Sequence, residues 1–352
     1  MVRLAINGYG RIGRISHRVI LERFSDKVEV AAINAGESTD IKGWMYLLKY
    51  DTMYGPLSGH TISANPAEPG ASNTKHGYIG DIVVDAKAIP VFSQKDSLQL
   101  PWKELNIDVV IEATGHLRTT DKAKAHITAG AKAVVISAPS KDDTATYVLS
   151  VNTDKYKGED IISNASCTTN CIAPVAKIME ESFGIEKAMM TTIHGYTSDQ
   201  RLQDGGHKDY RRARAAAQNI IPTSTGATLA SAKTLPSLAN KFTGLAIRVP
   251  VATGSLSDFT FLVARNTSKE EVNNVFKKAA SLNEYKGILE TTNDPIVSSD
   301  IIGNPHSAIV DLSLTQVVGG NLVKIIAWYD NEYGYANRLV EEAIMVGKKR
   351  YA

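Results

Sequence analysis

Cys167 and His194 are a cysteine and a histidine, types of side chain that suit nucleophilic attack on a carbonyl group. A thiolate is the nucleophile in such chemistry, and an imidazole within hydrogen-bond reach takes the thiol proton. Cys167 lies in the polar segment Ser-Asn-Ala-Ser-Cys-Thr-Thr-Asn at 163–170, between an apolar strand and a helical pattern. We therefore expect Cys167 at the start of a helix, where the helix dipole favours a thiolate and N–H groups can bind an oxyanion.

Both residues also have an ordinary structural interpretation. A single cysteine is often a small buried apolar side chain, and a histidine that ends a strand, as His194 does, is often structural. Spacing along the chain does not pair the two. The second cysteine, Cys171, stands four positions after Cys167, which suits neither a disulfide framework nor a four-ligand zinc site.

A glycine-rich turn gives a second chemical signal. Gly8, Gly10 and Gly13 spell G-x-G-x-x-G between an apolar strand at 2–7 and an amphipathic helix over 12–24. Glycines permit a tight turn and a close approach of backbone to a pyrophosphate, which a helix N-terminus stabilises. The flanking strand and helix favour a dinucleotide site over a purely structural turn.

The acidic residue that usually follows the second strand of such a site is missing. A carboxylate about 20 positions after the glycines normally binds the adenosine ribose hydroxyls. Here the second strand ends in Asn34 and Ala35. A small neutral residue removes the charge and bulk that reject a 2′-phosphate. Two alternatives are that Glu37 reaches back to the ribose, or that this segment is a plain loop.

The length and the hydrophobic pattern predict the elements that hold these residues. A chain of 352 residues exceeds the usual size of one hydrophobic core, which favours two domains. In the first half, β-branched runs at 28–33, 107–112 and 133–137 alternate with helix-length segments. This pattern predicts an α/β domain of the Rossmann type with a doubly wound parallel sheet.

The second half of the chain has longer runs, at 187–197, 244–264 and 307–329, in which apolar and polar residues often alternate. Alternation predicts antiparallel strands that are covered on one face. Ser268 and Glu271 form a capping box for a helix on that sheet. We predict an α+β catalytic domain with a mainly antiparallel sheet, and a further helix that closes the chain.

The bulk composition disfavours several classes of protein. Lys and Arg number 39 against 37 Asp and Glu, and a net charge of +2 gives no general attraction to nucleic acid or to an anionic membrane. No stretch approaches about 18 uninterrupted apolar residues, and no signal peptide precedes the first strand. We therefore expect a cytoplasmic protein. The segment 64–77, rich in Pro, Gly, Asn and Ser, is predicted to be a surface loop.

Four blocks of the sequence resemble the glyceraldehyde-3-phosphate dehydrogenase family. They are the glycine turn at 7–14, the cysteine segment at 163–170, His-Gly-Tyr-Thr at 194–197 and Trp-Tyr-Asp-Asn-Glu-Tyr-Gly-Tyr at 328–335. The similarity runs essentially end to end. Ser-Cys-Thr-Thr-Asn is highly specific to this family and to its erythrose-4-phosphate relatives, so the resemblance implies an enzyme of the phosphorylating type I.

The resemblance implies a chemistry for the two reactive residues. Cys167 attacks the aldehyde of glyceraldehyde 3-phosphate to give a hemithioacetal, while His194 takes the thiol proton and stabilises the alkoxide. Hydride then passes to the nicotinamide of NAD or NADP. Inorganic phosphate cleaves the remaining thioester to 1,3-bisphosphoglycerate, a step of glycolysis or gluconeogenesis.

The resemblance also assigns binding roles, and none of them requires a metal ion. Two phosphate sites draw on Ser166, Thr168, Thr197, Arg212, Thr225, Gly226 and Arg248. The dinucleotide site draws on Gly8, Gly10, Arg11, Ile12, Gly13, Asn34, Ala35, Lys95, Thr114, Gly115, Ser137 and Asn331. Without the resemblance, the arginines at 211, 212 and 214 would favour a solvated basic face over a nucleic-acid patch, and 225–226 would fit a simple turn.

Domain limits and assembly follow from the same resemblance. The Rossmann domain is expected at 1–166 and 331–352, because the closing helix returns to it, and the catalytic domain at 167–330. The expected assembly is a homotetramer in which the loop 199–214 completes the cofactor site of a neighbour.

Three changes, one of them at a pair of residues, depart from NAD-specific members of the family. Ala35 replaces Asp, Gly205-Gly206 replaces a stiffer pair such as Leu-Pro, and Lys95 replaces the usual Arg. All three reduce the discrimination against NADP, so we expect dual cofactor specificity or a preference for NADP. The segment 64–77 looks longer than the family norm, without bearing on the chemistry.

Two rival functions remain open. Erythrose-4-phosphate dehydrogenase shares the chemistry of Cys167 and His194 but releases the acid with water; Thr225-Gly226 disfavours it, because this pair belongs to the attacking-phosphate site. A non-catalytic nucleic-acid or scaffold protein on the same fold would leave both reactive residues idle. Loss of activity on thiol alkylation would exclude that alternative.

Overall fold

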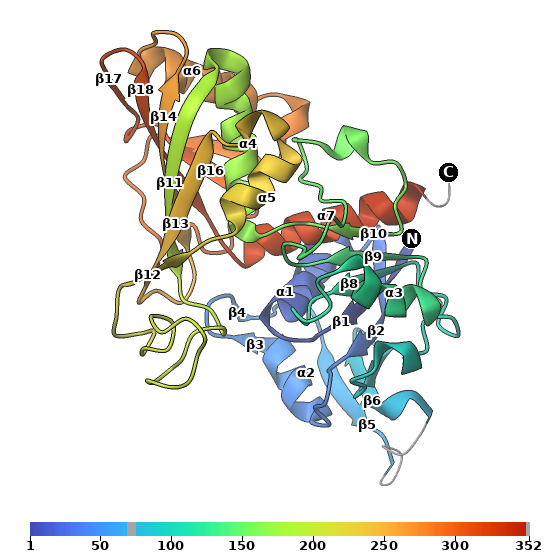
Figure 1. Cartoon of the computed structure of the whole chain (residues 1–352). Helices are drawn as coiled ribbons and strands as arrows, with labels where there is room; N and C mark the ends of the chain where they lie inside the picture. The colour runs from blue at the N-terminus through green and yellow to red at the C-terminus, as the bar shows by residue number, and fades with distance from the viewer. Residues whose placement is uncertain (69–74, 350–352) are drawn as a thin grey trace. The chain divides into compact units, whose positions relative to one another are not determined.

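The computed structural model describes residues 1–68 and 75–349, which form two compact units (Figure 1). The first unit contains 1–146 and 156–165, together with the chain from Ala336 onward. The second contains 147–155 and 166–335. These limits differ from the predicted domain limits chiefly at 147–155 and 331–335, both of which pack with the second unit. No helix among the described residues is long and apolar enough to cross a membrane.

The first unit is built on an eight-stranded sheet of order β10-β9-β8-β1-β2-β7-β6-β5. The strands are β1 (Val2–Asn7), β2 (Val28–Asn34), β5 (Ile62–Pro66), β6 (Tyr78–Val84), β7 (Lys87–Phe92), β8 (Val109–Glu112), β9 (Ala133–Ile136) and β10 (Ile161–Ser163). Neighbours from β10 to β7 run parallel, whereas β6 and β5 run antiparallel. The predicted doubly wound parallel sheet is confirmed around the glycine turn, and the antiparallel pair at its edge was not predicted.

Burial explains why these strands appear as continuous apolar runs in the sequence. Every residue of β8 and β9 is buried, as expected for parallel strands that are covered on both faces. Ala5, Val110 and Val134 pack in one core with Trp102 and with Ala123 of a covering helix. The helices of this unit are α1 (Arg11–Val19), α2 (Ile41–Lys49), α3 (Thr120–Thr128) and most of α7 (Tyr333–Lys349). The predicted helix over 12–24 is confirmed, with its last part, Ile20–Phe24, wound as a π-helix.

The second unit contains a mixed sheet of order β12-β13-β11-β14-β18-β16-β15, to which β17 adds beside β18. The strands are β11 (Ile185–Gly195), β12 (Ile221–Ser224), β13 (Phe242–Val249), β14 (Ser255–Val263), β15 (Leu289–Thr292), β16 (Ala308–Asp311), β17 (Gln316–Val318) and β18 (Leu322–Tyr329). Only the pairings β11 with β13 and β15 with β16 are parallel, so the sheet is mainly antiparallel as predicted. The long runs predicted at 244–264 and 307–329 each divide into separate strands.

One face of this sheet is covered and the other is open. Along β14, buried and half-buried residues alternate strictly from Ser255 to Val263. The covering helices are α4 (Cys167–Phe183), α5 (Ala227–Thr234) and α6 (Lys269–Ala280). Val175 of α4 and Phe276 of α6 share a core with Phe259 of β14. The predicted start of α6 is confirmed, because the Ser268 hydroxyl accepts from the Glu271 N–H at 3.2 Å.

The segment 64–77 differs from the prediction of a loop. Its first three residues belong to the edge strand β5, where they pair with β6. Lys75–Gly77 forms a 3-10 turn before β6. Residues 69–74 lie outside the described part of the chain.

Candidate active site

Cys167 is the first residue of α4, as the sequence predicts. Ser166 caps this helix with extended backbone angles, and its hydroxyl accepts from the Thr169 N–H at 3.0 Å. A polar cap satisfies one of the free N–H groups at the helix start. The cap therefore fixes the first turn of α4 and with it the half-buried thiol of Cys167.

His194 lies beside this thiol. The distance from the Sγ of Cys167 to the Nε2 of His194 is 3.4 Å. His194 is on β11, where Met190, Thr192 and His194 are buried on the covered face of the sheet. The period of two along a strand thus turns the imidazole toward α4. The fold brings together two residues that the sequence could not pair.

The other nitrogen of the imidazole is held by the backbone. The Nδ1 of His194 lies 2.6 Å from the carbonyl oxygen of Gly195, which can only accept. Nδ1 therefore carries the proton, and Nε2 presents its lone pair to Cys167. Arg248 also lies near, with Nη1 at 2.9 Å from Nδ1 and at 3.0 Å from the Gly195 oxygen. We assign its hydrogen bond to the oxygen, because two donors cannot bond each other.

Burial and charge favour the neutral forms of both groups. Burial, followed by the charge of Arg248, lowers the pKa of His194 to about 3. Burial raises the pKa of the Cys167 thiol, although the Arg248 charge and hydrogen bonds from Thr168 act in the opposite direction. At neutral pH the pair is a thiol and a neutral imidazole. Such a pair suits attack assisted by a general base.

A chain of buried hydroxyl groups lies next to the pair. The Tyr329 hydroxyl is 2.9 Å from the Thr168 Oγ1 and 2.8 Å from the Thr192 Oγ1. Its ring meets the His194 ring edge to face, with centroids 6.0 Å apart. Thr168 was predicted to bind phosphate, but its hydroxyl is already hydrogen-bonded to Tyr329 within the protein. Thr192 and Tyr329 were not predicted as parts of the site.

Two arginines carry the positive charge of this unit near the pair. Arg212 is held by the Thr223 Oγ1 at 2.9 Å and by Asp199 at 2.8 Å. Its charge acts on Arg248 and on His194, and it lowers the pKa of each in addition to burial. The Arg248 Nη1 also lies 3.5 Å from the Thr197 Oγ1. The two guanidinium groups are therefore close enough to form one region of positive potential.

Three further predicted residues take defined positions in the second unit. Thr225 and Gly226 precede α5, where the Thr225 hydroxyl accepts from the Ala227 N–H at 3.2 Å. Asn331 is buried just before α7. Its Oδ1 accepts from the Gly254 N–H at 3.0 Å and from the Ser255 hydroxyl, which fixes the orientation of the amide.

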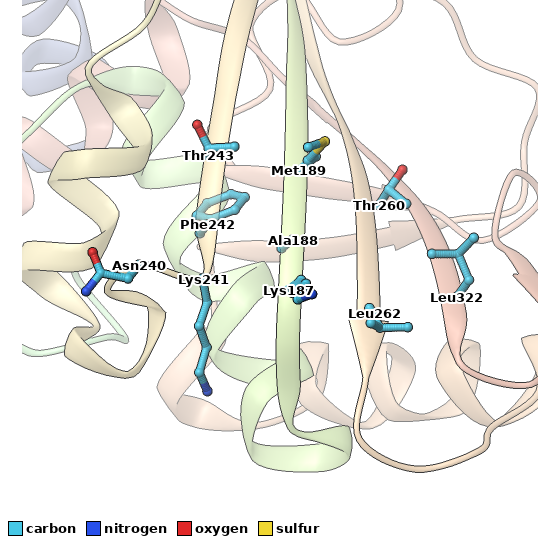
Figure 2. Close-up of a pocket in the computed structure, with 10 residues that line it drawn as sticks. All are labelled: Lys187, Ala188, Met189, Asn240, Lys241, Phe242, Thr243, Thr260, Leu262 and Leu322. Carbon is cyan, nitrogen blue, oxygen red and sulfur yellow. The ribbon is translucent and has the colours of Figure 1, made fainter.

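The hollow drawn in Figure 2 lies elsewhere on the same sheet. It has a volume of about 650 Å³ and is lined by Lys187, Met189 and Phe242 among others. Met189 is exposed, whereas its neighbours along β11, Ala188 and Met190, are buried. The hollow is therefore on the open face of the sheet, opposite the face that carries His194.

The glycine turn of the first unit fits a pyrophosphate. Gly8 has a φ of 96°, and a Cβ added there would lie 2.7 Å from the Thr114 nitrogen. A Cβ on Gly13 would lie 2.2 Å from the Gly8 oxygen. Gly10 caps α1 without a side-chain hydrogen bond, and the N-terminus of such a helix favours an anion. Arg11 is held beside the turn by Asp51 at 2.6 Å, and Ile12 follows it in the first turn of α1.

The end of β2 differs from a simple ribose site. The Asn34 amide donates to the Asn7 Oδ1 at 2.6 Å and to the Gln94 carbonyl at 2.8 Å. Both N–H bonds of Asn34 are therefore used within the protein. Beyond Ala35, the exposed carboxylate of Glu37 lies 3.2 Å from the Nζ of Lys95, which is also exposed.

The remaining predicted cofactor residues follow β8 and β9. Thr114 donates from its N–H and its hydroxyl to Glu112. Gly115 follows with a φ of 73°. The Ser137 N–H donates to the Glu112 carbonyl at 3.0 Å. Among the described residues, no cluster of His, Cys, Asp and Glu could hold a metal ion.

Comparison with known proteins decides the family. Residues 2–120 match the model of the glyceraldehyde 3-phosphate dehydrogenase NAD binding domain, and residues 166–331 match that of the C-terminal domain. Glyceraldehyde-3-phosphate dehydrogenase 2 of Streptomyces avermitilis is 49% identical over 350 residues, which cover 99% of each chain. The chain belongs to the glyceraldehyde-3-phosphate dehydrogenase family. The enzymes of that name from Streptomyces coelicolor and Mycobacterium tuberculosis are 50% and 48% identical, again over 99% of each chain.

Membership of the glyceraldehyde-3-phosphate dehydrogenase family confirms the resemblance seen in the sequence. The match of the NAD binding domain contains the glycine turn. The match of the C-terminal domain contains Cys167, His194, Arg212 and Arg248. Sequence reasoning missed Tyr329 and Glu112 as site residues, although each is a polar group at the end of an apolar strand, a pattern that could have identified them.

Proposed function

We propose that this chain is a phosphorylating glyceraldehyde-3-phosphate dehydrogenase, which oxidises D-glyceraldehyde 3-phosphate to 1,3-bisphosphoglycerate in glycolysis or gluconeogenesis. The observation that carries this proposal is the 3.4 Å approach of the Cys167 Sγ to the His194 Nε2 at the start of α4. The names of the relatives support the same substrate. The family membership disfavours a scaffold protein that does not use these residues.

The chemistry follows from the proton positions. The Nε2 of His194 takes the proton of the Cys167 thiol, and the sulfur attacks the aldehyde carbon to form a hemithioacetal. A nicotinamide dinucleotide held at the glycine turn would supply the acceptor for the hydride that leaves this carbon. The remaining thioester is attacked by an oxygen of inorganic phosphate, the carbon–sulfur bond breaks, and the thiol is restored with the acyl phosphate as product.

Charge neutralisation is the role we assign to the predicted phosphate ligands. Arg212 and Arg248 supply two guanidinium groups, which bind phosphate oxygens in pairs. Hydroxyl and backbone groups of Ser166, Thr168, Thr197, Thr225 and Gly226 complete the two anion sites. Because the Thr168 hydroxyl is bonded to Tyr329, its contribution would come from its backbone N–H at the start of α4.

We assign cofactor binding to residues of the first unit together with Asn331 of the second, and catalysis to the second unit. NAD is supported by the family model that covers 2–120. The pyrophosphate would be held by the glycine turn and by Arg11, the nicotinamide side by Thr114, Gly115 and Ser137, and the carboxamide by Asn331. Asn34 would act by positioning the end of β2, since its N–H bonds are used within the protein.

The finer proposal is dual specificity or a preference for NADP. Ala35 offers no carboxylate to a ribose, and Lys95 could bind a 2′-phosphate. Glu37, at 3.2 Å from Lys95, acts against this by competing for the lysine and by repelling the phosphate. The Glu37→Gln variant should therefore gain efficiency with NADP relative to NAD.

Steady-state kinetics with glyceraldehyde 3-phosphate test the whole proposal. The assay is run with NAD and with NADP, each with and without phosphate or arsenate. We expect oxidation that depends on added phosphate or arsenate. Phosphate-independent oxidation, especially of erythrose 4-phosphate, would replace the proposal with the erythrose-4-phosphate alternative. A large advantage of NAD over NADP would defeat only the cofactor preference.

We also infer a cytoplasmic homotetramer in which the loop 199–214 completes the cofactor site of a neighbour. The exposed side chains of Leu202 and Tyr210 in that loop support an interface there. Sedimentation equilibrium tests the assembly, and a monomer at micromolar concentration would contradict it.

A further inference from the structure

A cluster of buried polar side chains lies at the carboxyl ends of β1, β2 and β8. Asn7, Asn34 and Glu112 end these three strands, and each is almost fully buried. His126 of α3 and Trp102 complete the cluster, both without exposed surface. In the sheet order, β1 lies between β8 and β2, so the cluster is at the point where ligands of doubly wound folds bind.

Glu112 is the centre of this cluster. Its Oε2 accepts from the Asn7 amide at 2.5 Å and faces the His126 Nε2 at 3.0 Å. Its Oε1 accepts from the Thr114 N–H at 2.9 Å and from the Thr114 hydroxyl. An ionised carboxylate has about four acceptor positions and no donor. All four positions are used by three residues, Asn7, His126 and Thr114.

The partners of Glu112 are themselves fixed. The indole N–H of Trp102 can only donate, and it donates to the His126 Nδ1 at 2.9 Å. Nδ1 therefore carries no proton, and the proton of the neutral ring is on Nε2, where it points to Glu112. Asn7 is oriented by Asn34, whose amide donates to the Asn7 Oδ1 at 2.6 Å. Neither His126 nor Asn7 can turn an acceptor atom toward the side chain of residue 112 without losing another hydrogen bond.

The cluster is joined directly to the glycine turn. The Gly8 N–H donates to the Asn34 carbonyl at 2.9 Å, and the Ala113 N–H to the Asn7 carbonyl at 2.7 Å. A Cβ on Gly8 would lie 2.7 Å from the Thr114 nitrogen. The backbone at Thr114 therefore packs against the turn, and a shift of Thr114 changes the space beside Gly8.

We infer that Glu112 is a positioning residue for the dinucleotide: by accepting from both Asn7 and Thr114, it holds the ends of β1 and β8 at the spacing that the glycine turn requires. Burial of a carboxylate is unfavourable unless well-placed hydrogen bonds offset its loss of hydration, and an apolar side chain would fill the space without this cost. The inference rests on the proposed dinucleotide site of the first unit.

The Glu112→Gln variant tests the inference with almost no change of shape. Glutamine replaces two acceptor positions by two N–H donors, which then face donors of Thr114 or of Asn7 and His126. In the favoured arrangement the new NH₂ group of the glutamine faces Thr114. The Thr114 hydroxyl can rotate to accept from it, but the Thr114 backbone N–H remains a donor that faces a donor. We expect the dissociation constant for NAD, measured by calorimetry, to rise about tenfold or more, as for a lost hydrogen bond to a charged group. The KM for NAD should rise in parallel, with kcat at saturating NAD within about threefold of the original.

Glu29→Gln is the matched control. Glu29 lies on β2 of the same unit, is partly exposed and pairs with Arg3 at 2.8 Å. The Glu29→Gln variant loses a carboxylate by the same substitution, and we expect the affinity of this variant for NAD to equal that of the wild type. Should Glu112→Gln fail to fold, Thr114→Val removes only the hydroxyl donor and should still weaken NAD binding severalfold.

The outcomes separate three cases. An unchanged dissociation constant in folded Glu112→Gln, or in Thr114→Val if the first variant does not fold, would overturn the inference even if the melting temperature falls. A role in stability alone lowers that temperature without changing affinity or the ratio of KM to kcat. Wild-type protein that binds neither NAD nor NADP would defeat the proposed function, and the inference with it.

Discussion

Two buried histidines, His126 of the first unit and His194 of the second, have opposite surroundings. Both nitrogens of His126 have protein partners that themselves are fixed, the Trp102 indole at 2.9 Å and the Glu112 carboxylate at 3.0 Å. His194 is fixed only on the Nδ1 side, by the Gly195 carbonyl at 2.6 Å. Its Nε2 faces the half-buried thiol of Cys167.

The difference shows how the same side chain serves as scaffold or as base. A ring with two satisfied nitrogens cannot take a proton without losing a hydrogen bond, so His126 holds neighbouring groups in place. A neutral ring with an open lone pair next to a thiol can take its proton. Burial of both rings gives no indication of the role, and the partners of each nitrogen decide it.

The largest expected effect is the loss of the thiol. Cys167→Ser should lower kcat by at least about a thousandfold, because a hydroxyl is far less acidic and a weaker nucleophile than a thiol. Iodoacetamide should inactivate the wild-type enzyme by modifying Cys167, as mass spectrometry of the alkylated peptide would show. Cys171→Ala is the control, since Cys171 is buried in the core of the second unit, and most of the activity should remain. Comparable activity of Cys167→Ser would end the catalytic interpretation of both residues.

His194→Gln should have the second largest effect. Glutamine keeps a polar group near the sulfur but cannot take a proton, so we expect kcat to fall by about a hundredfold or more. Stopped-flow alkylation of Cys167 at pH 7 should slow as well. Rates within twofold of the wild type in both assays would mean that His194 is structural, like His126.

Particular elements show how far the sequence could predict the fold. Strands β1, β8 and β9 were predicted because burial on both faces leaves continuous apolar runs. The start of α4 followed from the polar segment around Cys167. Residues 64–66 of the edge strand β5 were predicted as loop, since the burial of this strand is low and its Asn and Pro are typical of loops. The division of 307–329 into three strands depends on pairing between distant segments, which no local pattern encodes.

The candidate site was predictable in its residue types and not in its contacts. Local pattern predicted the glycine turn and made Cys167 and His194 candidates, and the family resemblance favoured the chemical interpretation of these two residues. The distance between them depends on the meeting of α4 and β11, so no spacing could give it. Asn34 was expected to bind the cofactor, but both of its amide N–H bonds are used by Asn7 and Gln94. Such bonds are decided by residues far apart in the chain.

Acid stability gives the third prediction. The pKa of His194 is lowered to about 3 in the folded protein, and burial likewise lowers that of His17 to about 3. A lowered folded pKa contributes stability that is fully present above the unfolded value of about 6.5 and is lost as the pH falls toward 3. Protonation of each histidine should therefore lower the free energy of unfolding by about 2 kcal/mol between pH 7 and pH 5. Urea unfolding at both pH values measures this loss.

The His194→Gln variant provides the control for this acid effect. It lacks one of the two ionisations, so its loss of stability between pH 7 and 5 should be smaller than that of the wild type. An equal loss in both proteins would show that His194 does not contribute.

The smallest expected effect comes from the same substitution at the other histidine, His126→Gln. The amide oxygen can accept from Trp102 and the amide nitrogen can donate to Glu112, so both bonds can be kept in altered geometry. We expect a loss of about 1 kcal/mol in the free energy of unfolding, a KM for NAD raised a few-fold and a kcat within about twofold of the wild type. Urea unfolding and steady-state kinetics measure these values. A fall in kcat as large as that of His194→Gln would contradict the contrast between scaffold and base, because a ring whose nitrogens are both hydrogen-bonded within the protein cannot exchange a proton with the substrate.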